Sequence, residues 1–373
     1  MTKDREYQMC SRCVMDTTDQ DIVFDDKGVC NHCKSAEAKL EKITFENIEK
    51  RDLELNNIVE NIKQKGKGKK YDCIIGLSGG VDSSFLAYKV KKLGLRPLAV
   101  HLDNGWNSEL AVKNIETIVT KLDIDLFTHV IDWEEFRDLQ VAFIKSGVVD
   151  LEMLSDNAIV VSVYRIMKKY NIKTFLIGTN IATESIMPRK WFYVPKYDSL
   201  NIKSIYKKFG SGKKLKTFPM LSLLEYIQFH YFKSHSSVAL LDYMDYNKPE
   251  VLIFLQEELD YKPYPGKHYE SKITRFYQAY ILPVKYNIDK RKAHLSSLIV
   301  SKQISREKAI DELKKPLFKS DLEKENEIDF FCKKMTINRN EFDEFMSSER
   351  IEHHSYKSYY KYHINLRKFL KGQ

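Results

Sequence analysis

One glycine-rich loop constrains the fold of this chain more than any other feature. The apolar run Cys73-Ile74-Ile75-Gly76-Leu77 is followed directly by Ser-Gly-Gly-Val-Asp-Ser-Ser at residues 78–84, and an amphipathic segment comes next. Glycines let backbone N–H groups turn toward an anion, and the first turn of a helix adds the positive end of its dipole. The succession of strand, loop and helix therefore predicts a phosphate-binding site at the edge of a sheet.

The sequence around this loop alternates between apolar runs and amphipathic stretches in the same way. Short apolar runs predict strands at 72–77, 97–102, 126–131 and 174–178, and amphipathic stretches predict helices at 82–93, 108–122, 134–146 and 156–170. Strands and helices in alternation predict an α/β fold with a parallel, doubly wound sheet. The Walker A pattern and G-x-G-x-x-G are both absent, so neither a P-loop NTPase nor a dinucleotide-binding fold explains the loop.

Two closely spaced cysteine pairs precede this domain. Cys10 and Cys13 form one C-x2-C knuckle, and Cys30 and Cys33 form a second one 16 residues later. This spacing is typical of a zinc ribbon in which four thiolates close the coordination sphere of a structural Zn²⁺. An iron–sulfur cluster or reactive thiols are the alternatives, and His32 is expected to be an exposed neighbour of the site, not a ligand.

The 373 residues divide into four segments by composition. We expect a zinc ribbon at 1–40, a helix and linker at 41–70, the nucleotide-binding domain at 71–195, and a mostly helical C-terminal module at 196–373. The second segment contains a charged helix at 41–64 and a lysine- and glycine-rich linker at 65–70.

Charge and polarity restrict location and partners. The N-terminus is polar, and no apolar run approaches the ~20 residues that cross a bilayer, so we expect a cytoplasmic protein with no membrane contact. The net charge of +9 favours a polyanionic partner or a diphosphate-linked metabolite, or reflects a solvated lysine-rich surface.

Residues 78–83 match without a mismatch the S-G-G-x-D-S motif of the PP-loop ATP pyrophosphatases, and the chain resembles that superfamily. The resemblance implies a PP-loop, HUP-like Rossmannoid domain that splits ATP into AMP and pyrophosphate. It implies that Asp82 helps to place Mg²⁺. The other loop residues that it assigns to ATP are Gly76, Ser78, Gly79, Gly80 and Ser83.

The ends of two further strands are polar. Ligands of open α/β sheets bind at the carboxyl ends of the strands, so these residues are expected at the same site. By resemblance, His101 and Asp103 lie against the adenosine, and Gly178, Thr179 and Asn180 belong to a loop over the α-phosphate. Alternatively, His101 is a strand histidine that pairs with a neighbour.

The C-terminal segment contains three strings of unusual polar density. They are KHYES at 267–271, TRFYQ at 274–278 and DKRKAHLSS at 289–297. Together with the cysteine knuckles and the loop, they closely resemble the bacterial N-acetyl sugar amidotransferase family from about residue 8 to residue 316. Residues 317–373 have no assignment.

This family implies a specific reaction. ATP adenylylates the oxygen of a sugar N-acetyl group, and ammonia displaces AMP to give an acetamidino sugar for surface polysaccharide or flagellar glycan. Lys267, Arg275, Lys290 and Arg291 are then expected to contact phosphates or a sugar carboxylate, and His268 and Glu270 to orient or deprotonate ammonia. The alternative is a network of charges and aromatic rings between two domains.

The source of ammonia and the state of the sugar are further expectations. Four of the six cysteines are committed to metal and no segment remains for a glutaminase, so a separate glutaminase partner is expected to supply ammonia. The acceptor is expected to be nucleotide-activated. The lysine stretch at 203–216 reaches toward its diphosphate or is a solvated loop.

Two rival functions remain. A tRNA-thiolating or other tRNA-modifying enzyme shares the zinc knuckles and the loop, but Cys73 lies in a buried strand and Cys332 far along the chain, so neither suits sulfur transfer. Nucleic acid is therefore the less favoured partner. A zinc-ribbon scaffold with a degenerate nucleotide fold is the second rival, and the intact loop argues against it.

Overall fold

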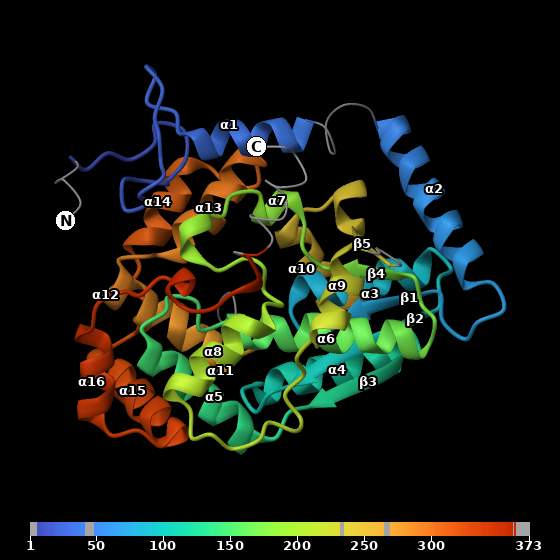
Figure 1. Cartoon of the computed structure of the whole chain (residues 1–373). Helices are drawn as coiled ribbons and strands as arrows, with labels where there is room; N and C mark the ends of the chain where they lie inside the picture. Colours follow the sequence, from blue (N-terminus) through green and yellow to red (C-terminus); the bar gives the residue numbers. More distant parts are fainter. Residues whose placement is uncertain (1–5, 42–47, 232–234, 265–268, 361, 363–373) are drawn as a thin grey trace, which may run out of the picture.

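The structure is a computed structural model and describes residues 6–41, 48–231, 235–264, 269–360 and 362 (Figure 1). Its centre is a five-stranded sheet in which every pair of neighbours is parallel, with strand order β3-β2-β1-β4-β5. The strands are β1 (Cys73–Gly76), β2 (Pro97–Asp103), β3 (Asp125–Val130), β4 (Thr174–Ile177) and β5 (Ser236–Ala239).

Helices cover both faces of this sheet because successive side chains of a strand point to opposite sides. Cys73, Ile75 and Leu77 pack in one core with residues of α2 (Ile48–Gly66), α3 (Val81–Lys92), α4 (Glu109–Leu122) and α10 (Lys248–Leu259). Ile74 packs on the opposite side, in a smaller core with α6 (Met153–Lys169). Both faces are buried, as a doubly wound sheet requires.

Most of the remaining helices contribute to the largest core, which also contains the four paired cysteines, whereas α9 packs in a small core with α6. Figure 1 shows the N-terminal segment, in blue, lying against α13 and α14. The helices not yet named are α1 (Asn31–Leu40), α5 (Trp133–Ser146), α7 (Ile181–Glu184), α8 (Ser199–Phe209), α9 (Leu223–Tyr231), α11 (Lys272–Phe276), α12 (Leu282–Tyr286), α13 (Lys290–Val300), α14 (Arg306–Lys314), α15 (Asp321–Met335) and α16 (Arg339–Ser347). A π-helical segment, Tyr277–Ile281, joins α11 to α12.

The expected parallel α/β fold and helical C-terminal region are confirmed. All four expected strands and all four expected helices of residues 71–195 are present, with ends that differ by at most a few residues. The bounds of one predicted helix differ from those in the structure. The helix expected at 41–64 is α2, which begins at Ile48 and runs through Gly66, into the expected linker. Residues 42–47 lie outside the described residues.

The fifth strand, β5, was not expected. It comes from the segment interpreted as purely helical and pairs with β4 through the register Thr174↔Ser236 to Ile177↔Ala239. The sheet therefore continues past residue 195, and the domain boundaries themselves stay a prediction. Among the residues that the structure describes, no helix has both the length and the apolar character that crossing a bilayer requires.

Candidate active site and metal centre

The glycine-rich loop lies where β1 ends and α3 begins. Gly79 has φ +80°, and a Cβ at this position would lie 2.7 Å from the carbonyl oxygen of Ala111, so a larger residue is excluded by both conformation and space. Inside the loop, Ser83 Oγ accepts a hydrogen bond from the Ser78 N–H at 3.3 Å and donates to the Gly80 carbonyl at 3.1 Å. These bonds fix a compact turn that opens toward the first turn of α3.

The strand order places this turn at a switch point of the sheet. From β1 the chain proceeds to β2 and β3 on one side and later to β4 and β5 on the other, so a crevice forms at the carboxyl ends of β1 and β4. Gly178 follows β4, and a Cβ there would lie 3.3 Å from Ser83 N. The two loops therefore approach each other backbone to backbone.

A cavity of about 780 Å³ occupies this crevice. Its wall contains residues of the β1, β2 and β4 ends, one face of α6, and residues of the C-terminal region. Ten sequence-predicted residues line it: Gly76, Ser78, Gly80, Asp82, Ser83, His101, Gly178, Thr179, Glu270 and Lys290. The volume is that of a typical ligand site.

The remaining predicted residues are placed elsewhere. Gly79, Asp103 and Asn180 lie beside the cavity without lining it; Asn180 caps α7 by accepting a hydrogen bond from Thr183 N at 2.9 Å. Arg275 and Arg291 are also outside the cavity wall. Lys267 and His268 lie outside the described residues.

The two arginines are held by carboxylates of the C-terminal region. Arg275 pairs with Glu323 at 3.0 Å and with Glu327, and only a tenth of its side chain is exposed. Arg291 forms a bidentate pair with Asp289 and donates to the carbonyl of Lys315 at 2.8 Å. This arrangement corresponds to the network of charges considered as the alternative, and it does not bring either guanidinium to the phosphate loop.

Three tyrosines that sequence reasoning missed contact the loop. The Tyr246 hydroxyl donates to Asp82 Oδ1, and the hydroxyls of Tyr261 and Tyr264 both donate to the Gly79 carbonyl, at 3.1 and 3.0 Å. Burial, and next the Asp82 carboxylate, raise the pKa of Tyr246 far above its ordinary value, so this hydroxyl keeps its proton. The C-terminal region thus helps to hold the loop.

His101 connects two strands inside the wall. Its Nδ1–H donates to the carbonyl of Leu77 at 2.9 Å, and its Nε2 accepts from the Asn107 amide at 3.0 Å. Burial lowers the pKa of His101, which agrees with a neutral ring between one acceptor and one donor. This is the neighbour pairing that the sequence left open, and the ring still faces the cavity.

Glu270 reaches the phosphate loop through a short pairing of two distant segments. The N–H of Ser108 donates to the carbonyl of Glu270 at 2.9 Å, and the N–H of Lys272 donates to that of Trp106 at 3.0 Å. A Cβ on Gly80 would lie 3.5 Å from Glu270 Oε1. The Glu270 carboxylate therefore lies beside the loop, and it also lines the cavity.

The opposite wall comes from one face of α6. Glu152, Ser155, Asp156, Ile159 and Ser162 follow one another at helical spacing and all line the cavity. Partial burial raises the pKa of the Asp156 carboxyl, and the nearby carboxylates add to this, although Lys196 at 3.0 Å opposes it.

The π-helical segment Tyr277–Ile281 and helix α13 complete the wall beside α6. Lys290 pairs with Glu152 at 2.8 Å, and Gln278 donates to the same carboxylate at 3.3 Å. His294 lies one turn beyond Lys290 and also lines the cavity. One cavity therefore contains both a phosphate loop and a polar wall that is suited to a second substrate.

The lysine-rich stretch lies apart from this cavity. Its six lysines are exposed, and Lys213, Lys214 and Lys216 border a separate hollow of about 320 Å³ beside the acidic first turn of α5. There, Glu135 accepts hydrogen bonds from the N–H groups of residues 216, 217 and 218. The loop is thus anchored to α5 by its backbone while its ammonium groups remain in solvent.

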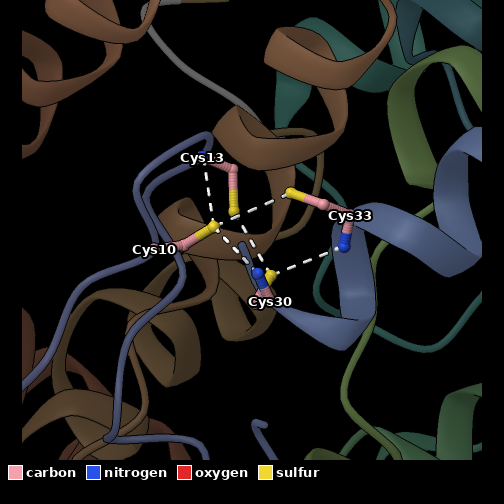
Figure 2. A group of neighbouring side chains, drawn as sticks. All are labelled: Cys10, Cys13, Cys30 and Cys33. Atoms are coloured by element: carbon pink, nitrogen blue, oxygen red, sulfur yellow. Dashed lines mark hydrogen bonds between the residues drawn. The ribbon is translucent and has the colours of Figure 1, made fainter. Parts of the chain in front are cut away.

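The four paired cysteines come together as expected (Figure 2). Their Sγ atoms all lie within 4.8 Å of one another, at 3.9 Å for Cys10 and Cys33 and 3.7 Å for Cys13 and Cys30, and all four residues are fully buried. Thiolates at ~2.3 Å from one tetrahedral ion are ~3.8 Å apart, so the geometry fits a single metal ion.

Backbone N–H groups surround these sulfur atoms. Cys10 Sγ accepts from the N–H groups of Arg12, Cys13 and Cys30 at 3.2 to 3.4 Å, which stabilises thiolate charge. His32 is not part of the cluster: its Nε2 lies 2.6 Å from Asp19 Oδ2, and its side chain is mostly buried, not exposed as expected. The four thiolates form the metal site without it.

The metal centre is attached to the wall of the cavity. Lys292 of α13 pairs with Asp16, and Ser296 Oγ accepts from the Val14 N–H at 3.2 Å. Arg306 donates to the carbonyls of Cys10 and Cys13 at 2.9 and 3.1 Å. The first cysteine knuckle therefore rests on α13 and α14.

The other two cysteines are remote from both sites. Cys73 is buried in β1 and Cys332 is buried in α15, and burial raises the pKa of each thiol. Neither lines the cavity. The geometry therefore provides no activated thiolate for sulfur transfer among the described residues.

Comparisons with known proteins agree with parts of this description. Over 173 residues the chain is 31% identical to an uncharacterized protein of Methanocaldococcus jannaschii, covering 45% of this chain and 58% of that protein. It is 36% identical over 67 residues to a tRNA(Ile)-lysidine synthase of Chlamydia pneumoniae, covering 17% of this chain and 21% of the enzyme. The chain thus matches only part of the length of these relatives.

Solved structures resemble it at low identity. The U34-tRNA thiolase NcsA of Methanococcus maripaludis with its 4Fe–4S cluster aligns with 85% of this chain and 93% of its own, at 14% identity and a TM-score of 0.35. The NH3-dependent NAD synthetase of Campylobacter jejuni aligns with 57% of this chain and 94% of its own, at 15% identity and a TM-score of 0.30.

A family model for the C-terminal domain of LPS biosynthesis proteins like WbpG matches residues 270–369. This range begins at Glu270, beside the phosphate loop, and includes Lys290 and His294 of the cavity wall. Residues 270–369 are thus similar to the WbpG-like C-terminal domain, and the same chain carries before them a parallel α/β domain with the loop at residues 78–84 and a cluster of four cysteines that could hold a metal ion.

Proposed function

We propose that this chain is an ATP-dependent amidotransferase that converts the N-acetyl group of a sugar into an acetamidino group. One observation carries the proposal: a single cavity joins a phosphate loop to the face of α6 and to the start of α13. An enzyme that activates one substrate with ATP and then replaces the leaving group needs both partners in one enclosure.

The loop half of the cavity suits the pyrophosphate part of ATP. The backbone of residues 78–80 and the start of α3 would hold the β- and γ-phosphates, which directs the α-phosphate toward Gly178 and Thr179 and the rest of the cavity. Asp82, Glu184 and Glu270 supply the carboxylate oxygens that Mg²⁺ prefers, and we assign Asp82 as its protein ligand. A bound Mg²⁺ would neutralise charge on the leaving pyrophosphate.

The acceptor half suits a polyhydroxylated molecule. In this half, Glu152 and Asp156 supply carboxylates, and among the described residues of the whole wall the ammonium groups are those of Lys248 and Lys290. Carboxylates accept hydrogen bonds from sugar hydroxyls. The match to a domain of LPS biosynthesis proteins supports a sugar of surface polysaccharide as the substrate.

The proposed reaction has two displacements. The N-acetyl oxygen attacks the α-phosphorus, the bond between the α-phosphorus and the bridging oxygen breaks, and pyrophosphate leaves. Ammonia then adds to the activated carbon, loses a proton, and the carbon–oxygen bond breaks to release AMP. The acetyl oxygen ends in AMP, and nitrogen takes its place in the sugar.

Glu270 is the candidate to accept the proton of the incoming ammonia. It lies beside Gly80, at the boundary between the two halves of the cavity. Lys290 is already paired with Glu152, so we assign it to organising the α6 wall and the sugar, not to the proton transfer. We propose a separate glutaminase as the source of ammonia, since free ammonia is scarce at neutral pH and water competes for the activated carbon.

Zn²⁺ is the proposed ion of the cysteine site. Four buried thiolates at single-ion spacing leave no open position for a substrate, so its role would be structural. Metal analysis of the purified chain distinguishes zinc from iron directly.

The function is tested by incubating the metal-loaded protein with ATP, Mg²⁺, ammonium and a panel of nucleotide-activated diacetamido sugars. We expect AMP release in proportion to sugar whose mass changes by the replacement of O by NH. AMP release without a change in any sugar would contradict the proposal that a sugar is the acceptor. Specific tRNA binding in a filter assay at physiological salt would then favour a tRNA-modifying enzyme. If no AMP is released with any of the sugars, whether ammonium or a glutaminase supplies the nitrogen, the proposed enzymatic activity is contradicted.

A further inference from the structure

The Gly79 carbonyl accepts two hydrogen bonds at once, both from tyrosine hydroxyls. Tyr261 Oη lies 3.1 Å from this oxygen and Tyr264 Oη 3.0 Å. Burial raises the pKa of both phenols, that of Tyr264 to about 12, so both remain donors near neutral pH. The two hydroxyls thus use both lone pairs of one loop carbonyl and tie the loop to the segment 261–264.

The orientation of this carbonyl determines the next N–H group. The peptide between Gly79 and Gly80 is planar and trans, so its C=O and N–H point in opposite directions. With the Gly79 oxygen turned to the tyrosines, the Gly80 N–H points toward Ser78 Oγ at 3.3 Å, a residue of the cavity wall. Glycines on both sides of the bond make rotation of this peptide easy, so something outside the loop must prevent it.

The tyrosines are themselves held by α4. Asn114 is almost fully buried; its Oδ1 accepts from the Lys262 N–H at 3.0 Å and its Nδ2 donates to the Lys262 carbonyl at 2.9 Å. This clamp fixes the segment between Tyr261 and Tyr264. Ala111, one turn earlier in the same helix, has its carbonyl against Gly79. Helix α4 therefore supports the peptide from two sides.

We propose that Tyr261 and Tyr264 are positioning residues that lock the Gly79–Gly80 peptide with its N–H on Ser78 Oγ, and so hold the Ser78 hydroxyl in place in the pyrophosphate subsite. This rests on the proposed function, in which the loop binds the β- and γ-phosphates. A Ser78 hydroxyl that is held by the locked peptide needs little reorganisation when the anion arrives. Tyr264 also lines the cavity, whereas Tyr261 does not, so Tyr261→Phe reports on positioning without a direct contact to the ligand.

The test uses Tyr261→Phe, Tyr264→Phe and the double variant of the full metal-loaded chain, which keep both rings and remove only the hydroxyls. Titration calorimetry with Mg²⁺ measures the affinity for inorganic pyrophosphate, for α,β-methylene-ATP and for AMP. We expect each single variant to weaken pyrophosphate binding about fivefold and the double variant more, since one hydrogen bond contributes about 1 kcal/mol. AMP, which lacks the β- and γ-phosphates, should bind as it does to the parent chain.

Tyr356→Phe is the matched control, because Tyr356 also donates to a backbone carbonyl, that of Ser146, away from the cavity. It should leave all three affinities unchanged. Equal affinity of the double variant and the parent for pyrophosphate would overturn the positioning role, as would an equal loss for AMP and pyrophosphate. If the parent chain binds neither pyrophosphate nor the ATP analogue, the proposed function fails, and the two failures are thereby distinguished.

Discussion

Lys290 and Glu152 form an ion pair of 2.8 Å inside the cavity and join the first turn of α13 to the start of α6. Both side chains are largely shielded from solvent, with 13% and 18% exposed. Gln278 supplies a further hydrogen bond to Glu152. A shielded pair of this kind fixes the geometry of the acceptor wall more than it stabilises the fold.

Lys290→Met should lower the rate of AMP release at least tenfold, because Glu152 keeps a charge without its cation and the wall loses its shape. The free energy of unfolding should fall by about 1–3 kcal/mol, since the Glu152 carboxylate stays partly buried after the loss of the Lys290 ammonium group. Urea unfolding measures the stability, and Glu152→Gln in the same chain should recover most of the lost stability but not the rate. As a surface control, Lys314→Met breaks an exposed pair with Asp311 and should change neither quantity.

Asp82→Asn should reduce AMP and pyrophosphate formation by more than about 100-fold, because the amide is a poor Mg²⁺ ligand at the leaving group. Its side chain still accepts the hydrogen bond from Tyr246, so the melting temperature should stay close to that of the parent. Asp123→Asn, at the exposed left-handed end of α4, is the matched control. An unchanged rate in Asp82→Asn would contradict the Mg²⁺ assignment.

The parts of the site that the sequence predicted have short-range patterns. The loop and the two cysteine knuckles are each specified within a few residues, and the strands β1 to β4 are apolar runs. The polar face of α6 was readable as well, since Glu152, Ser155 and Asp156 have helical spacing, but no motif drew attention to it. Periodicity predicts which residues share a face and leaves open what that face meets.

The unpredicted parts depend on contacts between distant segments. Strand β5 is four residues with little apolar content and pairs with β4 across some sixty residues. The chain has 22 tyrosines, and nothing local marks Tyr261 or Tyr264 as partners of Gly79. Arg275 was expected, from the family resemblance, to contact a phosphate or a sugar carboxylate, yet its carboxylate partners come from α15. Such pairings are determined by tertiary packing.

Removal of the metal should loosen α13 in particular. The cysteine knuckle holds this helix through Lys292 and Ser296, so a chelated chain should lose more than about 3 kcal/mol of unfolding free energy. Hydrogen exchange followed by mass spectrometry should show faster exchange in peptides covering 290–306 than in those of α4, and Cys30→Ser should reproduce this. Cys332→Ala, a cysteine outside the cluster, should retain the metal. Equal protection of α13 with and without metal would contradict the coupling.

The contribution of Asp242 to the free energy of unfolding should be more favourable in mild acid than at neutral pH. Burial raises the pKa of this carboxyl to about 6, and it accepts a hydrogen bond from the Ile181 N–H at 2.7 Å, at the start of α7. A carboxyl whose pKa is higher in the folded state than in the unfolded state binds more protons when folded. Its contribution therefore favours the folded state below pH ~4 and is lost as the pH rises through 6.

Asp242→Asn tests this sign, because the amide keeps the acceptor for Ile181 and removes the titration. The variant should exceed the parent in unfolding free energy by about 1–3 kcal/mol at pH 7.5, and the advantage should shrink steadily toward pH 4.5. Urea unfolding of both chains across this range gives the difference, in which the other titrating groups cancel. An advantage that grows on acidification would mean that Asp242 is held as a carboxylate in the folded chain, with a pKa below that of the unfolded state.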